Sequence, residues 1–153
     1  MSALNNRSAV ASADRVLVIT RVLAAPPALV FQAWTDPARM MQWYAPEGLQ
    51  TPYAESELRV GGRFRVLMRE PDGKEHDVSG EYREIVTDRK LVFTWAWPRS
   101  PDDISVVTVE LQPEGDGTRL TLTHEQLPDA AERDSHQSGW SSALDKLGKL
   151  VAA

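Results

Sequence analysis

The spacing of hydrophobic residues predicts a strand near the start of the chain, followed by two short helices. Residues 15–24, RVLVITRVLA, are rich in β-branched side chains and end before a pair of prolines, which the first turn of a helix tolerates. Hydrophobic residues then recur at helical spacing until Pro37 interrupts them. Asp36 can cap a second short helix that leads to Trp43.

The middle of the chain changes to the two-residue period of β-strands. Phe64, Val66 and Met68 alternate with mainly basic residues, and the sequence PDG at residues 71–73 predicts a hairpin turn. Later segments repeat the alternation, and each places hydrophobic residues on one face. The predicted inward positions of these segments are Leu91, Phe93, Trp95, Trp97, Val107, Val109, Leu111, Leu120, Leu122 and His124. We therefore expect an antiparallel meander.

After Pro128 the period returns to that of an α-helix. With Trp140 as the origin and about 100° per residue, the hydrophobic residues of this segment fall on one stripe, and His136 falls on it too. Gly139 lies beside the stripe, although glycine costs up to about 1 kcal/mol of helix stability relative to alanine. The pattern predicts a long amphipathic C-terminal helix with a polar side chain and a gap on its buried side.

These elements define an α+β fold. A sheet of about six or seven antiparallel strands with one apolar face needs a cover, and the C-terminal helix is the long amphipathic element that can provide it. A curved sheet around this helix leaves a cavity wherever the facing side chains are small. We expect a single domain over residues 15–153, preceded by a flexible leader over residues 1–14.

Composition narrows the classes of function. The net charge of -5 and scattered basic residues argue against nucleic acid as a partner. The chain has no cysteine, which excludes disulfides and thiolate chemistry. No apolar run approaches the roughly 20 residues of a membrane span, and the N-terminus lacks a signal-peptide pattern, so a cytoplasmic location is expected. The sequence does not decide the oligomeric state; a homodimer is the alternative kept, because it is the commonest soluble oligomer.

Several ordered motifs resemble one protein family. They are APPALVFQAWTDPARMMQWYAP, ELRVGGRFRVLMREPDG, GEYREIVTDRKLVFTW, TRLTLTHEQLP and HQSGWSSALDKLGKL. Together they resemble the Activator of Hsp90 ATPase homologue 1-like family of the START-like, or SRPBCC, helix-grip superfamily. The resemblance implies an antiparallel sheet that grips the C-terminal helix, with a largely apolar cavity between them. Eukaryotic Hsp90 activators carry an additional N-terminal domain for which 153 residues leave no room, so a direct Hsp90 role is not expected.

Two histidines are the sharpest candidates for chemistry. His124 is in phase with its strand's inward residues and His136 with Trp140, so both should point into one interior. They either bind a polar group of a ligand or bond backbone carbonyls and tryptophan indoles as structural groups. His76, in the hairpin, is expected to be remote from both, so neither a metal site nor a cofactor is predicted.

The aromatic residues on the predicted inner face form either the core or the wall of a pocket. The full set of candidate ligand-binding residues is Trp43, Phe64, Val66, Met68, Tyr82, Phe93, Trp95, Trp97, His124, His136, Gly139 and Trp140. The leading hypothesis is a binding protein for a small hydrophobic or amphipathic molecule of the lipid, sterol-like or aromatic polyketide class. The alternatives are a cyclase- or hydratase-like enzyme that uses the same pocket, although no catalytic motif is recognisable, and a protein-interaction module of co-chaperone type.

Overall fold

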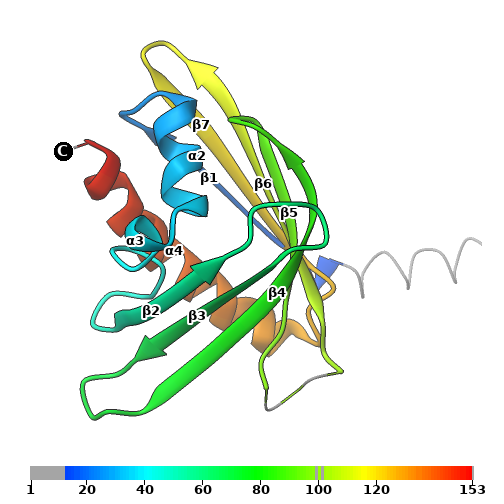
Figure 1. Cartoon of the computed structure of the whole chain (residues 1–153). Helices are drawn as coiled ribbons and strands as arrows, with labels where there is room; N and C mark the ends of the chain where they lie inside the picture. Colours follow the sequence, from blue (N-terminus) through cyan, green and yellow to red (C-terminus); the bar gives the residue numbers. More distant parts are fainter. Residues whose placement is uncertain (1–12, 99, 101, 153) are drawn as a thin grey trace, which may run out of the picture.

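In the part of the chain that the structure describes, the fold consists of a seven-stranded antiparallel sheet and three helices (Figure 1). The computed structural model describes residues 13–98, 100 and 102–152. The elements are β1 (Leu17–Leu23), α2 (Pro27–Thr35), α3 (Pro37–Met40), β2 (Gln50–Ser56), β3 (Arg63–Arg69), β4 (Glu75–Val86), β5 (Lys90–Trp95), β6 (Ser105–Glu114), β7 (Gly117–Glu125) and α4 (Ala130–Ala152). The first twelve residues of the predicted leader lie outside the described residues.

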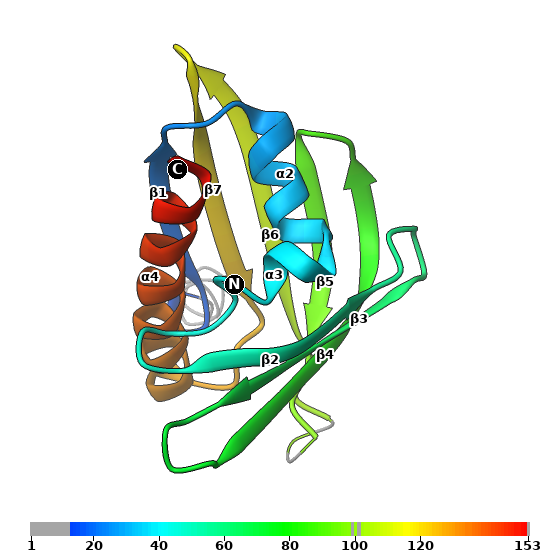
Figure 2. The same cartoon turned by 60° about the vertical axis from the view of Figure 1, so that its left-hand side comes forward.

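The strands follow the order β1-β7-β6-β5-β4-β3-β2. From β2 to β7, each strand pairs with the next strand along the chain. β1, near the start of the chain, pairs with β7, near its end, from Leu17 opposite His124 to Leu23 opposite Thr118. The sheet curls, and α2 and α4 lie against its concave side (Figure 2). The predicted helix-grip architecture, including the two short helices after the first strand, is confirmed.

Local sequence explains the ends of these elements. Pro27 begins α2, and the side chain of Asp36 accepts a hydrogen bond of 3.1 Å from the Ala38 amide at the start of α3, as the capping pattern predicted. In β4, a Cβ at Gly80 would overlap the Thr94 carbonyl oxygen. Glycine therefore lets β4 and β5 approach closely where the sheet curls.

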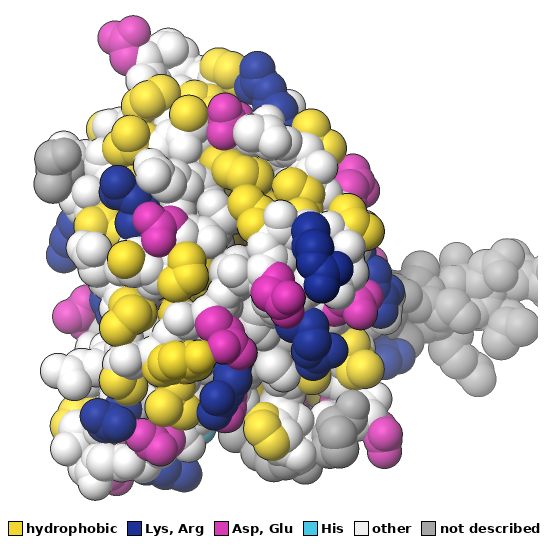
Figure 3. Space-filling view, in the orientation of Figure 1, with side chains coloured by type: hydrophobic (Ala, Val, Ile, Leu, Met, Phe, Trp, Pro, Cys, Tyr) yellow, Lys and Arg dark blue, Asp and Glu magenta, His cyan; other side chains and the backbone are white. Residues whose placement is uncertain are grey.

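The alternation in β3 is the one expected from the sequence. Phe64, Val66 and Met68 are buried, whereas Arg65 and Arg69 of the same strand point outward and pair with carboxylates of β4. On α4 the buried residues are Trp140, Ala143, Leu144, Leu147 and Val151, which is the predicted stripe. The core thus lies between the concave face of the sheet and the helices. Basic and acidic side chains are interspersed with hydrophobic ones over the face shown in Figure 3.

Candidate functional site

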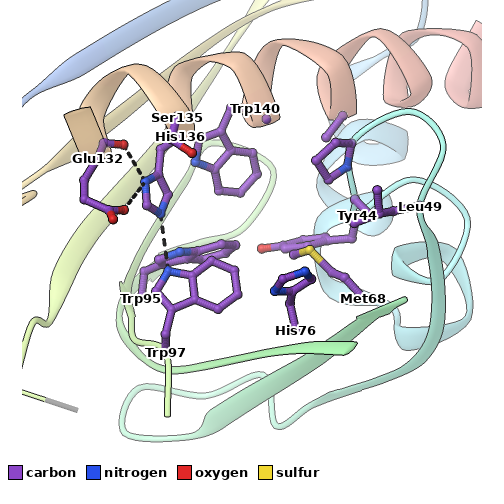
Figure 4. Close-up of a pocket in the computed structure, with 14 residues that line it drawn as sticks. Tyr44, Leu49, Met68, His76, Trp95, Trp97, Glu132, Ser135, His136 and Trp140 are labelled. Carbon is purple, nitrogen blue, oxygen red and sulfur yellow. Dashed lines mark hydrogen bonds and ion pairs between the residues drawn. The ribbon is translucent and has the colours of Figure 1, made fainter. Parts of the chain in front are cut away.

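A cavity of about 270 Å³ lies between the sheet, the α3–β2 loop and the first half of α4 (Figure 4). Its walls come from segments that are far apart in the sequence. The lining residues are Tyr44, Ala45, Pro46, Leu49, Met68, His76, Trp95, Trp97, Glu132, Ser135, His136, Gly139, Trp140 and Ala143. The volume is close to the lower end of the roughly 300–1,000 Å³ of small-molecule sites.

Aromatic rings form most of the inner wall. Trp95 is central: its ring centroid is 5.0 Å from that of Trp140, 5.7 Å from that of Trp97 and 6.3 Å from that of Tyr44. The Tyr44 and Trp95 rings are nearly parallel, with an interplanar angle of 21°. Such walls favour a hydrophobic and planar occupant.

The Tyr44 side chain brings a polar group into this apolar space. Tyr44 is only 3% exposed, and its hydroxyl has no hydrogen-bond partner among the described residues. Figure 4 shows the hydroxyl oxygen pointing into the pocket. Burial, with a smaller contribution from Tyr82, raises the pKa of Tyr44 well above its ordinary value, so the side chain is a neutral phenol that can donate or accept.

His136 stands on the α4 wall with both ring nitrogens engaged. Its Nδ1 is 2.7 Å from the Glu132 backbone carbonyl, to which it donates. Its Nε2 accepts from the Trp97 indole at 3.4 Å (Figure 4). This arrangement assigns the proton to Nδ1 and orients the imidazole edge at the cavity.

His124 lies behind the wall and is fully buried. Its Nδ1 accepts from the Trp140 indole at 3.0 Å, so its Nε2 carries the proton and donates to the Ser105 hydroxyl at 2.7 Å. Ser105 in turn donates to the Trp95 carbonyl at 3.2 Å. Burial, and secondarily the nearby His136, lowers the pKa of His124 to about 3, so this histidine is neutral at physiological pH.

His76 lines the same cavity as His136, so its expected remoteness from that histidine was wrong. Its Nε2 lies 2.6 Å from the Glu70 carboxylate. Trp97 stands between the two cavity histidines, with ring centroids 6.5 Å from His76 and 6.1 Å from His136. The hairpin register explains the position: His76 is directly opposite Met68, and opposite residues share a face of the sheet.

The structure divides the predicted ligand-binding residues into two groups. Those that line the cavity are Met68, Trp95, Trp97, His136, Gly139 and Trp140. Those outside the lining are Trp43, Phe64, Val66, Tyr82, Phe93 and His124, all of them buried in the core. For example, the Trp43 indole donates to the Ala33 carbonyl at 2.8 Å, and Phe64 packs edge-on against Phe93 at 5.1 Å. Phe64 and His124 contact the wall residue Trp95, with ring centroids 6.3 and 5.8 Å away, and all six residues belong to the core.

The sequence prediction missed the loop that completes the cavity. Tyr44, Pro46 and Leu49 belong to a segment without periodicity, and its only sequence signal is the proline and glycine of YAPEGL. Side chains on α4 hold this loop in place. Lys146 donates to the Ala45 carbonyl at 3.0 Å, and the Ser142 hydroxyl accepts from the Glu47 amide at 2.6 Å.

A curled sheet that grips a C-terminal helix over a lined cavity defines the class of helix-grip proteins. The sequence matches the family Activator of Hsp90 ATPase homolog 1-like protein over residues 24–152, and the chain belongs to this family. The comparison with curated proteins gives no match. In the described part of the chain, no helix combines the length and apolarity that a membrane span requires.

Solved structures share the fold over nearly their whole length. A protein of Chromobacterium violaceum is 29% identical, with a TM-score of 0.85 over 91% of this chain and 98% of its own. The AHSA1 protein of Silicibacter pomeroyi is 31% identical, with a TM-score of 0.79 over 90% of this chain and 97% of its own. An AHSA1-like protein of Aeromonas hydrophila is 25% identical, with a TM-score of 0.74 over 88% and 90%.

Proposed function

We propose that this protein binds a small hydrophobic or amphipathic molecule in the cavity beneath the α3–β2 loop. The observation that carries the proposal is the cavity itself, about 270 Å³ with walls from three tryptophans and a tyrosine. This volume favours a molecule of one or two fused rings, or a short chain, over a complete sterol or a long-chain lipid. Of the ligand classes considered from the sequence, the aromatic one fits best.

A cavity-filling variant tests the proposal. At Gly139 a Cβ would make an ordinary contact with Pro46 at 3.6 Å, so α4 accepts a side chain there, and that side chain would occupy the cavity. In isothermal titration calorimetry with ethylnaphthalene, the wild-type protein should bind and Gly139→Leu should not.

Gly148→Ala is the matched control. It also changes a glycine of α4, but a Cβ at Gly148 contacts Leu23, and Gly148 is not among the residues that line the cavity. The control should bind as the wild type does. Equal binding by Gly139→Leu and the wild type would place the ligand elsewhere and contradict the proposal.

A second candidate function is proton transfer to or from the bound molecule. The observation that favours it is the pair of Glu70 and His76, because a carboxylate that orients an imidazole is a common arrangement for a histidine acting as a general base. His76 lines the cavity, so a ligand's acidic C–H could reach it.

Hydrogen–deuterium exchange tests this second function. The methyl protons of bound acetylnaphthalene, next to its carbonyl, should exchange with deuterated solvent when His76 removes a proton and a deuteron replaces it. His76→Gln should abolish the enzymatic exchange and retain binding. The absence of exchange above the buffer rate in the wild type would exclude this function for aryl ketones.

A further inference from the structure

The polar groups of the cavity differ in whether they are already satisfied. The two ring nitrogens of His136 bond to Glu132 and Trp97, and the Trp140 indole bonds to His124. Two buried lining residues instead carry polar groups without a partner among the described residues. They are the Tyr44 hydroxyl and the Trp95 indole N–H, and both side chains are more than nine-tenths buried. For the Trp95 N–H, which is itself buried, the missing partner is costly. The Tyr44 oxygen instead keeps some accessible surface, which faces the cavity.

Both unpaired groups can donate a hydrogen bond. An indole N–H is only a donor, and a phenol O–H donates or accepts. An acceptor atom on a bound molecule could therefore pair with the Tyr44 hydroxyl, whereas the Trp95 N–H is buried within the wall. The Tyr44 hydroxyl is the group that Figure 4 shows directed into the cavity, so it is the contact residue, and its ring already packs against Trp95.

The charges around the cavity restrict the kind of acceptor. No lysine or arginine occurs among the described residues of the lining, whereas Glu132 contributes a carboxylate at its rim. On the opposite side, His76 is already paired with the Glu70 carboxylate. The Lys146 ammonium lies outside the lining and donates to the carbonyls of Ala45 and Leu49. A ligand carboxylate would lose its hydration here without gaining a cationic partner.

We propose that the preferred ligand is an uncharged aromatic molecule with an acceptor oxygen, such as an aryl ketone, whose oxygen accepts a hydrogen bond from Tyr44. This inference rests on the proposed function and specifies its ligand class. It excludes aromatic and fatty carboxylates as preferred occupants. It also assigns the specificity of the cavity to Tyr44 rather than to the histidines.

Three probes of nearly equal size test the inference by isothermal titration calorimetry at neutral pH. They are acetylnaphthalene with a carbonyl oxygen, ethylnaphthalene without an acceptor, and naphthoate with a carboxylate. The wild type should bind acetylnaphthalene about tenfold more tightly than ethylnaphthalene, which corresponds to one well-formed hydrogen bond. Naphthoate should bind more weakly than either.

Tyr44→Phe separates the hydroxyl from the ring. The variant should bind both uncharged probes equally, with the affinity for ethylnaphthalene unchanged. It should fold normally, because removal of an unpaired buried hydroxyl costs little. Tyr82→Phe is the matched control: that buried tyrosine bonds to Ser56 at 2.7 Å and lies outside the lining, so the preference for the ketone should persist.

The possible outcomes separate a failure of the proposed ligand preference from a failure of the proposed binding function. If neither uncharged probe binds, the proposed function fails and the inference fails with it. If both bind with equal affinity to the wild type, or if naphthoate binds best, the cavity is a binding site but the inference is overturned. A ketone preference that survives in Tyr44→Phe would also overturn the role of Tyr44.

Discussion

The imidazole of His124 is held by a continuous chain of hydrogen bonds. Trp140 donates to one ring nitrogen, and the other donates to Ser105, which donates to the backbone of Trp95. Every polar atom in the chain has a partner, so a fully buried histidine is compatible with an apolar core. Because His124 lies behind the cavity wall, a structural role is favoured over direct contact with a ligand.

This burial predicts how stability depends on pH. The pKa of His124 is about 3 in the folded protein, against about 6.5 in an unfolded chain. Between these values the unfolded chain binds a proton that the folded protein does not, so the free energy of unfolding falls as the pH falls below about 6.5. Between pH 6.5 and 5, the titration of His124 should lower the free energy of unfolding by roughly 2 kcal/mol. Above pH 7 it should cause no further change with pH.

Chemical denaturation of the wild type and His124→Gln at several pH values measures this contribution. Carboxylates titrate in the same range, so the relevant quantity is the difference between the two proteins. The wild type should be the more stable at pH 7, and the difference should shrink as the solution is acidified. A difference that is constant from pH 7 to 5 would contradict the assignment.

The buried residues of β3 show what a periodic pattern can and cannot predict. Phe64 and Met68 lie on the same face of β3, as alternation indicated, yet only Met68 lines the cavity. Alternation gives the face of a side chain but not its distance from α4 and the loop. The position of His76 was predictable from the sequence, because the expected turn at residues 71–73 already implied that His76 lies opposite Met68.

At the scale of elements, the α3–β2 loop depends on α4 for its position. Lys146 donates to the carbonyls of Ala45 and Leu49, and Ser142 accepts from Glu47. These contacts join residues about a hundred positions apart, so no local pattern could predict them. The strands and helices were predictable because their hydrophobic periods are local, whereas this part of the site is fixed by tertiary contacts.

The loop should become more mobile when its ammonium partner is removed. Lys146→Met keeps the aliphatic stem but loses both hydrogen bonds to carbonyls, at a local cost of about 1.5–3 kcal/mol. Amide hydrogen exchange at Glu47 and Leu49 should accelerate by roughly ten- to a hundredfold. Lys149→Met is the control, because that exposed lysine of α4 makes no such contact with any residue that the structure describes. Equal exchange rates in the two variants would refute the role of Lys146.

The two glycines of α4 lead to a prediction about the stability of this helix. Added Cβ atoms at Gly139 and Gly148 would each have a nearest neighbour at 3.6 Å, which is ordinary contact. Gly139→Ala and Gly148→Ala should therefore each stabilise the protein by up to about 1 kcal/mol through helix propensity. Urea denaturation measures the gain. A loss of stability in Gly139→Ala alone would show that the loop cannot accept the added methyl group.

At the scale of the whole molecule, a cluster of aromatic rings connects all the layers. Trp34 of α2 lies 4.6 Å from Trp43, 6.3 Å from Phe93 of β5 and 5.7 Å from Trp140 of α4, measured between ring centroids. The pairing of β1 with β7 adds a connection between the two ends of the described fold. Loss of any one layer would disrupt contacts in the others.

We therefore expect cooperative unfolding in a single transition. Far-ultraviolet circular dichroism, which reports on the backbone, and tryptophan fluorescence, which reports on the cluster, should give coincident urea curves. A fluorescence change at lower urea than the loss of circular dichroism would mean that the helices leave the sheet before it unfolds.

The tryptophans have an optical consequence. Three of the five in the chain line the cavity, so an occupant would touch most of the protein's own emitters. A ligand that absorbs where indole emits should quench this emission by energy transfer over such short distances. The protein thus contains an intrinsic reporter of occupancy, and compound libraries can be screened on the unlabelled chain.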